Sequence, residues 1–282
     1  MDSLMSWQQQ QAGGDNATRS PAEEEGLWGL RGDPRLKDWP FTGGPTGVAC
    51  LLALYLVGCV ALGPRLMRNR KPLSLRPLLL AYNVFMVGAS VHFAYITVKE
   101  AYVESGYSLW CQADDSLTSP RAMIMLRHGW WYLLLKMTEL LDTFFFVLRK
   151  KNQHISFLHV LHHTLALVTV WLDLYMGVLG HVALFPLLNS SVHIVMYTYY
   201  GLAALSPNLR PNLWWKKYVT QFQIAQFMVL TVHAIVPILH ECGFPQGFAC
   251  FMAAEAALFS ALFSQFYVRT YMKRGDKSLK DR

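Results

Sequence analysis

Long apolar segments alternate with short polar connections along most of this chain. Each segment approaches the roughly 20 residues that a helix needs to cross about 30 Å of hydrocarbon. The pattern therefore predicts an all-α integral membrane protein with seven transmembrane helices and a membrane domain over residues 46–268. The expected spans are Thr46–Leu62, Pro77–Val98, Trp130–Leu148, Phe157–Leu174, Val182–Leu205, Tyr218–Leu239 and Phe248–Tyr267.

The two ends of the chain differ from this membrane domain. Residues 1–45 are polar and rich in Gly, Gln and Pro, so we expect a flexible segment there, and residues 269–282 form a basic tail. Only 15% of the residues are charged, against about 25% in typical soluble domains. The basic residues flank apolar spans and form no separate module, which argues against a nucleic-acid-binding protein.

Basic residues gather on one side of the expected membrane. The first, third and fifth connections and the tail are rich in Lys and Arg, whereas the fourth and sixth connections contain none. Because positively charged connections remain in the cytosol, we expect a cytosolic C-terminus and, with seven spans, a lumenal N-terminus.

Two features of the expected lumenal side agree with this orientation. The tripeptide Asn16-Ala17-Thr18 makes Asn16 a candidate glycosylation site. Cys111 and Cys242 fall in the second and sixth connections, where an oxidising lumen allows a disulfide between them. Two free thiols are the alternative.

Polar residues recur at helical spacing inside several spans. In the third span, Lys136, Glu139 and Asp142 share one helix face. A charge in hydrocarbon is costly unless it has a partner or a function, so this stripe is either an ion pair that fixes helix packing or the lining of a polar site. Similar stripes in other spans comprise Asn189, His193, Tyr197 and Tyr200, then Thr220, Gln223 and Gln226, and also Tyr82, Asn83 and His92.

Three histidines, His159, His162 and His163, stand at the start of the fourth span. With a rise of 1.5 Å per residue, the latter two lie about 8–9 Å from its cytosolic end. The stripes of the third, fifth and sixth spans also fall in the cytosolic half of the membrane. This convergence predicts one buried polar pocket that opens to the cytosol.

Two kinds of chemistry suit these imidazoles. His159 and His163 have the i, i+4 spacing of metal ligands, and membrane di-iron desaturases and hydroxylases contain a comparable His box. Those enzymes need several boxes, whereas this chain of ten histidines has one. Imidazole can also act as acid, base or nucleophile, with Asp142 or Glu139 orienting a ring nitrogen. A metal-dependent lipid desaturase or hydroxylase remains the alternative, and a seven-span receptor or transporter is a third reading.

Taken together, these motifs resemble the very-long-chain fatty acid elongase (ELO) family. The resemblance runs from about residue 37 to residue 272. It implies a very-long-chain 3-oxoacyl-CoA synthase of the endoplasmic reticulum membrane, which joins a long-chain acyl-CoA to malonyl-CoA and needs no metal or cofactor. It also implies six helices in a barrel around a closed-ended acyl tunnel, with the first span outside. The matching segments are Lys136–Thr143, Arg149–Lys151, His159–His163, Asn189–Tyr200, Leu213–Lys217 and Thr220–Gln226.

The resemblance further suggests residue roles. We expect His162 and His193 nearest the acyl carbon, with His162 as the nucleophile of a ping-pong reaction. His159, His162, His163 and His193 are all candidates to stabilise developing negative charge, and Asp142 or Glu139 would hold the imidazoles in register. Expected substrate contacts are Lys136, Asn189, Tyr197, Tyr200, Gln223 and Gln226, and expected CoA-phosphate contacts are Arg149, Lys150, Lys151, Lys216 and Lys217.

The chain departs from the family pattern in two places. Many members have tryptophans directly after the His box, whereas this chain has the segment Thr164–Trp171 there. The acyl length that a typical member prefers therefore does not predict the acyl length preferred by this chain. The tail lacks a proper dilysine signal, so residence in the endoplasmic reticulum is inferred from the family. Expected partners are the 3-ketoacyl-CoA reductase, dehydratase and enoyl reductase of the elongation cycle, and a homodimer stays open.

Overall fold

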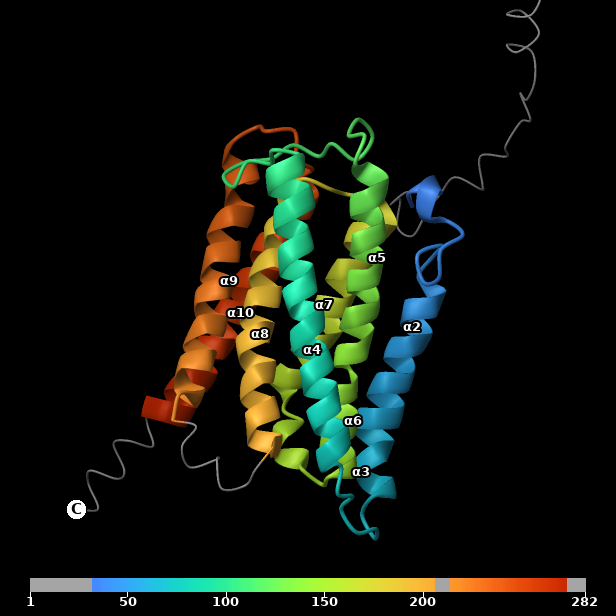
Figure 1. Ribbon diagram of the computed structural model, residues 1–282, viewed down its shortest axis with the longest axis vertical. Coiled ribbons are helices and arrows are strands. Elements are labelled where there is room, and N and C mark those ends of the chain that lie inside the picture. Colours follow the sequence, from blue (N-terminus) through green and yellow to red (C-terminus); the bar gives the residue numbers. More distant parts are fainter. Residues whose placement is uncertain (1–31, 206–213, 273–282) are drawn as a thin grey trace, which may run out of the picture.

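Long helices run side by side in the computed structural model, which describes residues 32–205 and 214–272 (Figure 1). The first helical rod comprises α2 (Thr46–Ala53), π-helical turns over Leu54–Leu62 and α3 (Gly63–Leu66). The others are α4 (Arg76–Thr97, prolonged by π-helical turns over Val98–Glu104), α5 (Ala122–Glu139), α6 (Leu141–Leu148), α7 (Phe157–Met176), α8 (Leu184–Leu205), α9 (Lys216–Leu239) and α10 (Gln246–Tyr267, prolonged by π-helical turns over Val268–Met272).

Six helical segments of the described chain are long and apolar enough to cross a membrane, and they correspond to six of the seven expected spans. The expected third span differs. It begins earlier, at Ala122, and is divided at Leu140 into α5 and α6. Its Lys136, Glu139 and Asp142 make it less apolar than the others, although it lies alongside them (Figure 1). The all-α membrane architecture is thus confirmed.

Local signals set both ends of α7, the helix that carries the three clustered histidines. Ser156 adopts an extended conformation before the helix, and its hydroxyl accepts a hydrogen bond from the His159 backbone N–H at 3.2 Å. Gly177 ends the helix with φ of 67°, a left-handed conformation that suits glycine. These caps place the histidines on the first two helical turns.

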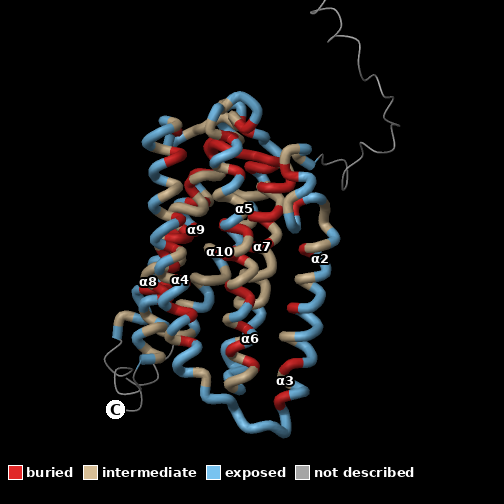
Figure 2. The backbone as a smooth tube through the Cα atoms, turned by 45° about the vertical axis from the view of Figure 1, so that its right-hand side comes forward, coloured by how far each residue is buried: buried red, intermediate tan, exposed pale blue. Residues whose placement is uncertain are grey.

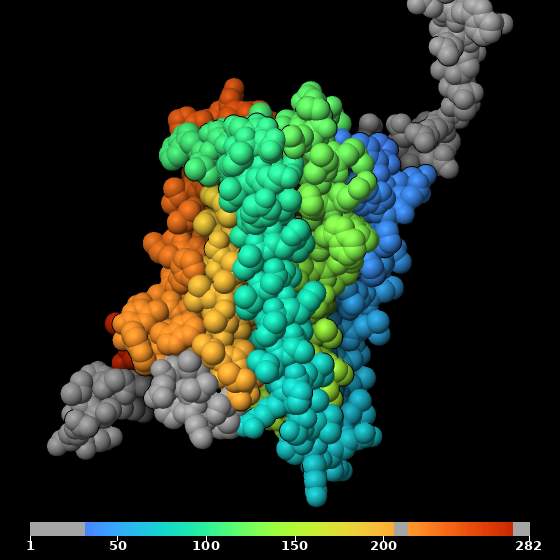
Figure 3. Space-filling view, viewed as in Figure 1, coloured from blue at the N-terminus to red at the C-terminus, as the bar shows by residue number. Residues whose placement is uncertain are grey.

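Helix packing buries one side of each element and leaves the other apolar and exposed. α4 lies along α8, α9 along α10, and α5 along α7; the first of these contacts is visible in Figure 3. Large apolar side chains such as Leu54 and Val103, 71% and 70% exposed, point away from the core. Such surfaces suit lipid, and α2–α3 stands at the edge of the bundle (Figure 2).

The helices end in two chemically different surfaces. The basic end comprises the connections around residues 63–76, 149–156 and 214–216. The opposite end carries Cys111 and Cys242, which form a disulfide, and is the disulfide end. At the disulfide end, Asp33 donates its backbone N–H to the carbonyl of Tyr175 at 2.7 Å, and Leu36 is fully buried. The part of the N-terminal segment that follows residue 32 is therefore packed against the bundle, whereas Asn16 lies outside the described residues.

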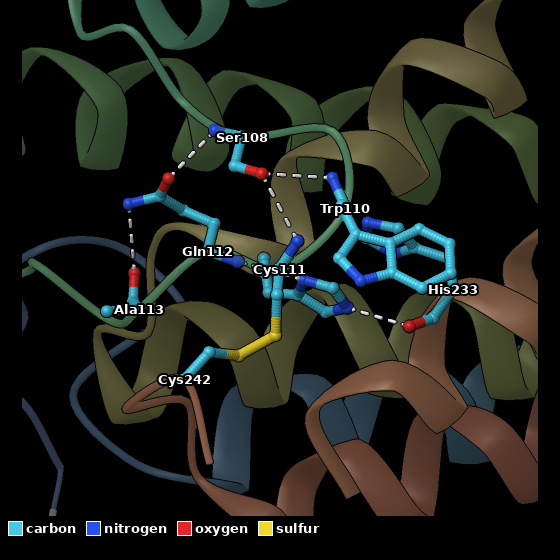
Figure 4. The surroundings of a disulfide bond; sticks show 8 residues. Ser108, Trp110, Cys111, Gln112, Ala113, His233 and Cys242 are labelled. Atoms are coloured by element: carbon cyan, nitrogen blue, oxygen red, sulfur yellow. Dashed lines mark hydrogen bonds between the residues drawn. A yellow bond between two sulfur atoms is a disulfide. The ribbon is translucent and has the colours of Figure 1, made fainter. Parts of the chain in front are cut away.

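A disulfide joins Cys111 and Cys242, with their Cα atoms 6.1 Å apart (Figure 4). It ties the long connection before α5 to the short connection between α9 and α10. Directly beside it, the imidazoles of His181 and His233 stack with ring centroids 3.7 Å apart. The three remaining cysteines, Cys50, Cys59 and Cys250, are free thiols.

Loss of this disulfide should destabilise the fold, because it closes a loop of 131 residues. We expect Cys111→Ser/Cys242→Ser to lower the free energy of unfolding by about 2–5 kcal/mol, the usual range for a native disulfide. Thermal unfolding of the purified protein in detergent would measure this. Cys250→Ser is the matched control, and equal melting temperatures for the two variants would contradict the expectation.

Candidate active site

A cavity of about 550 Å³ lies near the basic end, between α4, α6, α7, α8, α9 and α10. We call it the polar cavity. It brings together residues that are far apart in sequence and that the helical stripes predicted to converge. The predicted site residues in its lining are Asp142, Arg149, Lys151, His159, His162, His163, Asn189, His193, Tyr200, Lys216, Gln223 and Gln226.

Three of the cavity histidines form a cluster on the first turns of α7. The rings of His159 and His163 are 4.4 Å apart between centroids, and those of His162 and His163 are 5.5 Å apart. The ring of His162 also contacts Phe227 and Phe259 edge-on, at 5.9 and 5.2 Å. The cluster thus has an apolar wall on the side of α9 and α10.

Another cavity histidine, His193 on α8, is held by a buried ionic network. Its Nδ1 lies 3.1 Å from Oε1 of Glu139, and the same oxygen accepts a hydrogen bond from Lys136 Nζ at 2.7 Å. The lysine also donates to Oδ1 of Asn189 at 2.5 Å. Lys136 and Glu139 are 2% and 1% exposed and do not line the cavity. They lie behind its wall and orient the side chains that form it.

Two consecutive residues of α6 bind different neighbouring helices. Asp142 accepts a hydrogen bond from the hydroxyl of Tyr197 on α8 at 2.8 Å. Thr143 hydrogen-bonds through Oγ1 to Nε2 of His159 on α7 at 2.7 Å. Tyr197 is fully buried and, like Glu139, supports the cavity wall from behind. α6 therefore couples the two histidine-bearing helices.

The mouth of the cavity is positively charged. Arg149, Lys151 and Lys216 line it together with His154. Burial, and then the positive charges of Lys216, Lys151 and Arg149, lower the pKa of His154 below its usual value. Such a mouth favours an anionic ligand such as a phosphate.

Five predicted site residues do not line the cavity. Lys136, Glu139 and Tyr197 lie behind the wall. Lys150 donates its ammonium to the carbonyl of Arg68 at 2.9 Å, and Lys217 lies over the ring of Tyr218. These two lysines therefore lie outside the cavity.

Sequence reasoning also missed contributors to the site. Tyr132 donates to Oδ1 of Asn189 at 2.8 Å, and its position one helical turn before Lys136 was a usable signal. Phe263 contacts the ring of His162, and Tyr55 hydrogen-bonds to Thr143; no sequence spacing indicates either. Of the second span's stripe, Asn83 lines the cavity, whereas His92 is exposed to the outside.

Comparison with known proteins gives this cavity its context. The model of the ELO (GNS1/SUR4) family matches residues 40–279. The chain belongs to the ELO family. Its relatives include a very long chain fatty acid elongase of Aedes aegypti, 43% identical over 242 residues, which are 85% of this chain and 67% of the relative. Very long chain fatty acid elongase 7 of Rattus norvegicus is 40% identical over 248 residues, 87% of this chain and 88% of the relative.

Family membership decides between the readings that the sequence left open. It identifies the chain as a very long chain fatty acid elongase, a condensing enzyme, and not as a desaturase, receptor or transporter. In this elongase the segments that carried the resemblance supply sixteen of the residues that line the polar cavity. The cavity is therefore the candidate active site.

The Lys136–Glu139 pair generates a prediction about stability. Removing one partner of a buried ion pair leaves an uncompensated charge and costs about 3–5 kcal/mol, whereas replacing both by apolar residues costs much less. We expect Glu139→Leu to lower the melting temperature more than Lys136→Met/Glu139→Leu does, as measured in detergent. Additive losses in the double variant would show that the pair is not coupled.

Proposed function

We propose that the polar cavity is the place where this elongase joins a long-chain acyl-CoA to malonyl-CoA. The products are a 3-ketoacyl-CoA two carbons longer, CO2 and CoA. The observation that carries the proposal is the meeting of His159, His162, His163 and His193 with a positively charged mouth in one cavity. Arg149, Lys151 and Lys216 would bind the phosphates of CoA, while the thioester reaches the imidazoles.

The first half-reaction would acylate His162. In the described part of the chain, neither ring nitrogen of His162 has a hydrogen-bonding partner, so a lone pair is free to attack the thioester carbonyl. The carbon–sulfur bond breaks, CoA leaves as the thiol with the proton of the imidazole, and an acyl-imidazole forms. The apolar ring wall formed by Phe227, Phe259 and Phe263 would shield this intermediate from water.

The second half-reaction would use malonyl-CoA. Loss of CO2 leaves its electron pair on an enolate, and the enolate carbon attacks the acyl carbon. The bond to His162 breaks, and the imidazole regains a proton. Donors must stabilise the enolate oxygen. The amide of Gln226 is one candidate, because its buried Nε2 has no hydrogen-bonding partner among the described residues. His193 is the other: as an imidazolium paired through Nδ1 with Glu139, it would donate from Nε2–H.

The acyl chain would extend from the polar cavity towards the disulfide end. A second cavity of about 110 Å³ lies there, lined mostly by apolar side chains such as Phe93, Leu126 and Val170. We propose that α4–α10 enclose a closed-ended tunnel through this region and that α2–α3 stands outside it. Each methylene buried there would contribute about 0.8 kcal/mol to binding.

The same proposal sets the cellular context. With the basic end cytosolic, the cavity mouth faces the CoA esters, and the disulfide end and Asn16 face the lumen of the endoplasmic reticulum. The 3-ketoacyl-CoA product would pass to a separate reductase, dehydratase and enoyl reductase in the same membrane. The oligomeric state, including a homodimer, is an open part of this proposal.

Replacement of the proposed nucleophile tests the mechanism. We expect His162→Ala to abolish formation of the 3-ketoacyl-CoA while the protein stays folded, because alanine cannot form the acyl intermediate. Purified protein would be incubated with acyl-CoAs of several lengths and malonyl-CoA, with products followed by mass spectrometry. Retained turnover in a folded His162→Ala protein would contradict the assignment.

The acyl intermediate gives a second readout of the same step. With acyl-CoA alone, the unmodified enzyme should release about one equivalent of CoA and gain the mass of the acyl group, and His162→Ala should do neither. His240→Ala, at an exposed histidine that lines neither cavity, is the matched control. The ping-pong route would be excluded if acyl-CoA alone released no CoA although the same enzyme turned over rapidly once malonyl-CoA was added.

The unpaired amide of Gln226 should contribute to binding or stabilisation of the malonyl group. Gln226→Leu removes the donor at similar size, so we expect kcat/KM for malonyl-CoA to fall by about 10- to 100-fold, the loss of a hydrogen bond to a charged group. Steady-state kinetics at a saturating acyl-CoA concentration would measure it. Gln221→Leu, at a residue that instead bonds to Tyr267, is the control.

A further inference from the structure

A chain of hydrogen bonds leads from the peripheral rod into the histidine cluster. The hydroxyl of Tyr55 lies 3.0 Å from Oγ1 of Thr143, and that oxygen lies 2.7 Å from Nε2 of His159. The ring of His159 contacts that of His163 with centroids 4.4 Å apart. Tyr55 does not line the polar cavity itself, but these contacts connect it to the cavity residue His159 from the rod at the edge of the bundle (Figure 1).

Burial distinguishes Tyr55 from its neighbours on the rod. Leu54 and Val57 are 71% and 55% exposed, whereas Tyr55 is 5% exposed and Thr143 is fully buried. An apolar residue would suffice to pack the rod against α6. A buried phenol is instead costly unless its hydroxyl is hydrogen-bonded, and here the partner is the threonine that contacts a cavity histidine.

The numbers of donors and acceptors define the direction of the hydrogen bonds that connect Tyr55, Thr143 and His159. A threonine hydroxyl has one hydrogen, so it can donate to only one of its two partners. Among the described residues, the Tyr55 hydroxyl has no partner other than Thr143. If Thr143 donated to Tyr55, the phenolic hydrogen would be buried without an acceptor. Tyr55 therefore donates to Thr143. If Nε2–H of His159 also donated to Thr143, the threonine hydrogen would be buried without an acceptor among the described residues, so Thr143 donates to Nε2.

The tautomer of His159 follows from this direction. Since Nε2 accepts a hydrogen bond, the hydrogen of the neutral imidazole is on Nδ1. The ring then presents an N–H donor from Nδ1 rather than from Nε2. The hydrogen bond from Tyr55 polarises the Thr143 hydroxyl and strengthens its donation to Nε2, so without Tyr55 the preference for the Nδ1–H tautomer weakens.

We propose that Tyr55 is a positioning residue of the condensation site, which acts through Thr143 to hold His159 in the Nδ1–H tautomer. This inference rests on the proposed participation of His159 in catalysis. It gives the first helical rod a chemical role beside its structural one. A rod that stands at the edge of the bundle would thereby supply the terminal donor for the active site.

Tyr55→Phe removes the hydroxyl and keeps the ring. We expect kcat to fall by about three- to tenfold, the effect of losing one hydrogen bond, with KM for both CoA esters unchanged. Thr143→Val should have at least the same effect, and Thr143→Ser should retain most activity because it keeps the hydroxyl. Tyr95→Phe, at a tyrosine that is 62% exposed on α4, is the matched control.

The double variant Tyr55→Phe/Thr143→Val separates a relay from simple packing. If Tyr55 acts only through Thr143, the double variant should be no slower than Thr143→Val alone. Multiplying losses, or a fall in melting temperature that parallels the loss of kcat, would show a merely structural role and overturn the inference.

The tautomer itself is observable in nitrogen-15 spectra of the full-length protein labelled at histidine, with His159→Gln identifying the signals. We expect the protonated nitrogen of His159 to be Nδ1 in the unmodified protein and the Nε2–H form to appear in Tyr55→Phe. Identical spectra would overturn the inference. Full turnover by folded His159→Gln would instead refute the catalytic role of His159. Failure of the tautomer inference is therefore distinguishable from failure of the proposed function of His159.

Discussion

The buried ion pair between Lys136 and Glu139 is the interaction on which the polar interior depends. Both side chains are almost fully removed from water, within a helix surrounded by apolar ones. Neither charge could stay there alone, because an unpaired buried charge costs several kcal/mol. Glu139 then also contacts His193, and Lys136 contacts Asn189. Charges that would otherwise oppose folding thus orient the side chains that face the cavity.

In this arrangement, the residues that support the cavity wall differ from the residues that face the cavity. Lys136, Glu139 and Tyr197 lie behind the cavity wall, where they are protected from water and fixed by hydrogen bonds. The histidines stand in front of them, where a substrate can reach. Polar groups held in fixed geometry stabilise developing charge without reorganisation, as the enolate of the proposed second half-reaction would require.

The two ends of the bundle complement each other. Connections at the disulfide end are tied by the Cys111–Cys242 bond and by the packing of the segment around Leu36. At the basic end, the cavity opens between α6, α7, α8 and α9 beside Arg149, Lys151 and Lys216. A positively charged mouth at the basic end suits the phosphorylated head group of the proposed CoA substrates.

The sequence by itself determined the helices, their polar faces and the family. Apolar length predicts a span because hydrocarbon thickness is constant, and polar stripes predict convergence because unpaired polar groups are costly in a membrane. It also indicated most of the polar side chains in the cavity lining, since His159, His193 and Gln226 lie on such stripes. Only the tertiary structure decided which stripe residues face the cavity and which lie behind it, as Glu139 does. Likewise, Tyr55 and Phe263 stand in apolar segments without a polar stripe, and the sequence did not indicate their contacts. These contacts depend on how separate helices are rotated relative to one another, and the spacing of residues within one helix does not determine that rotation.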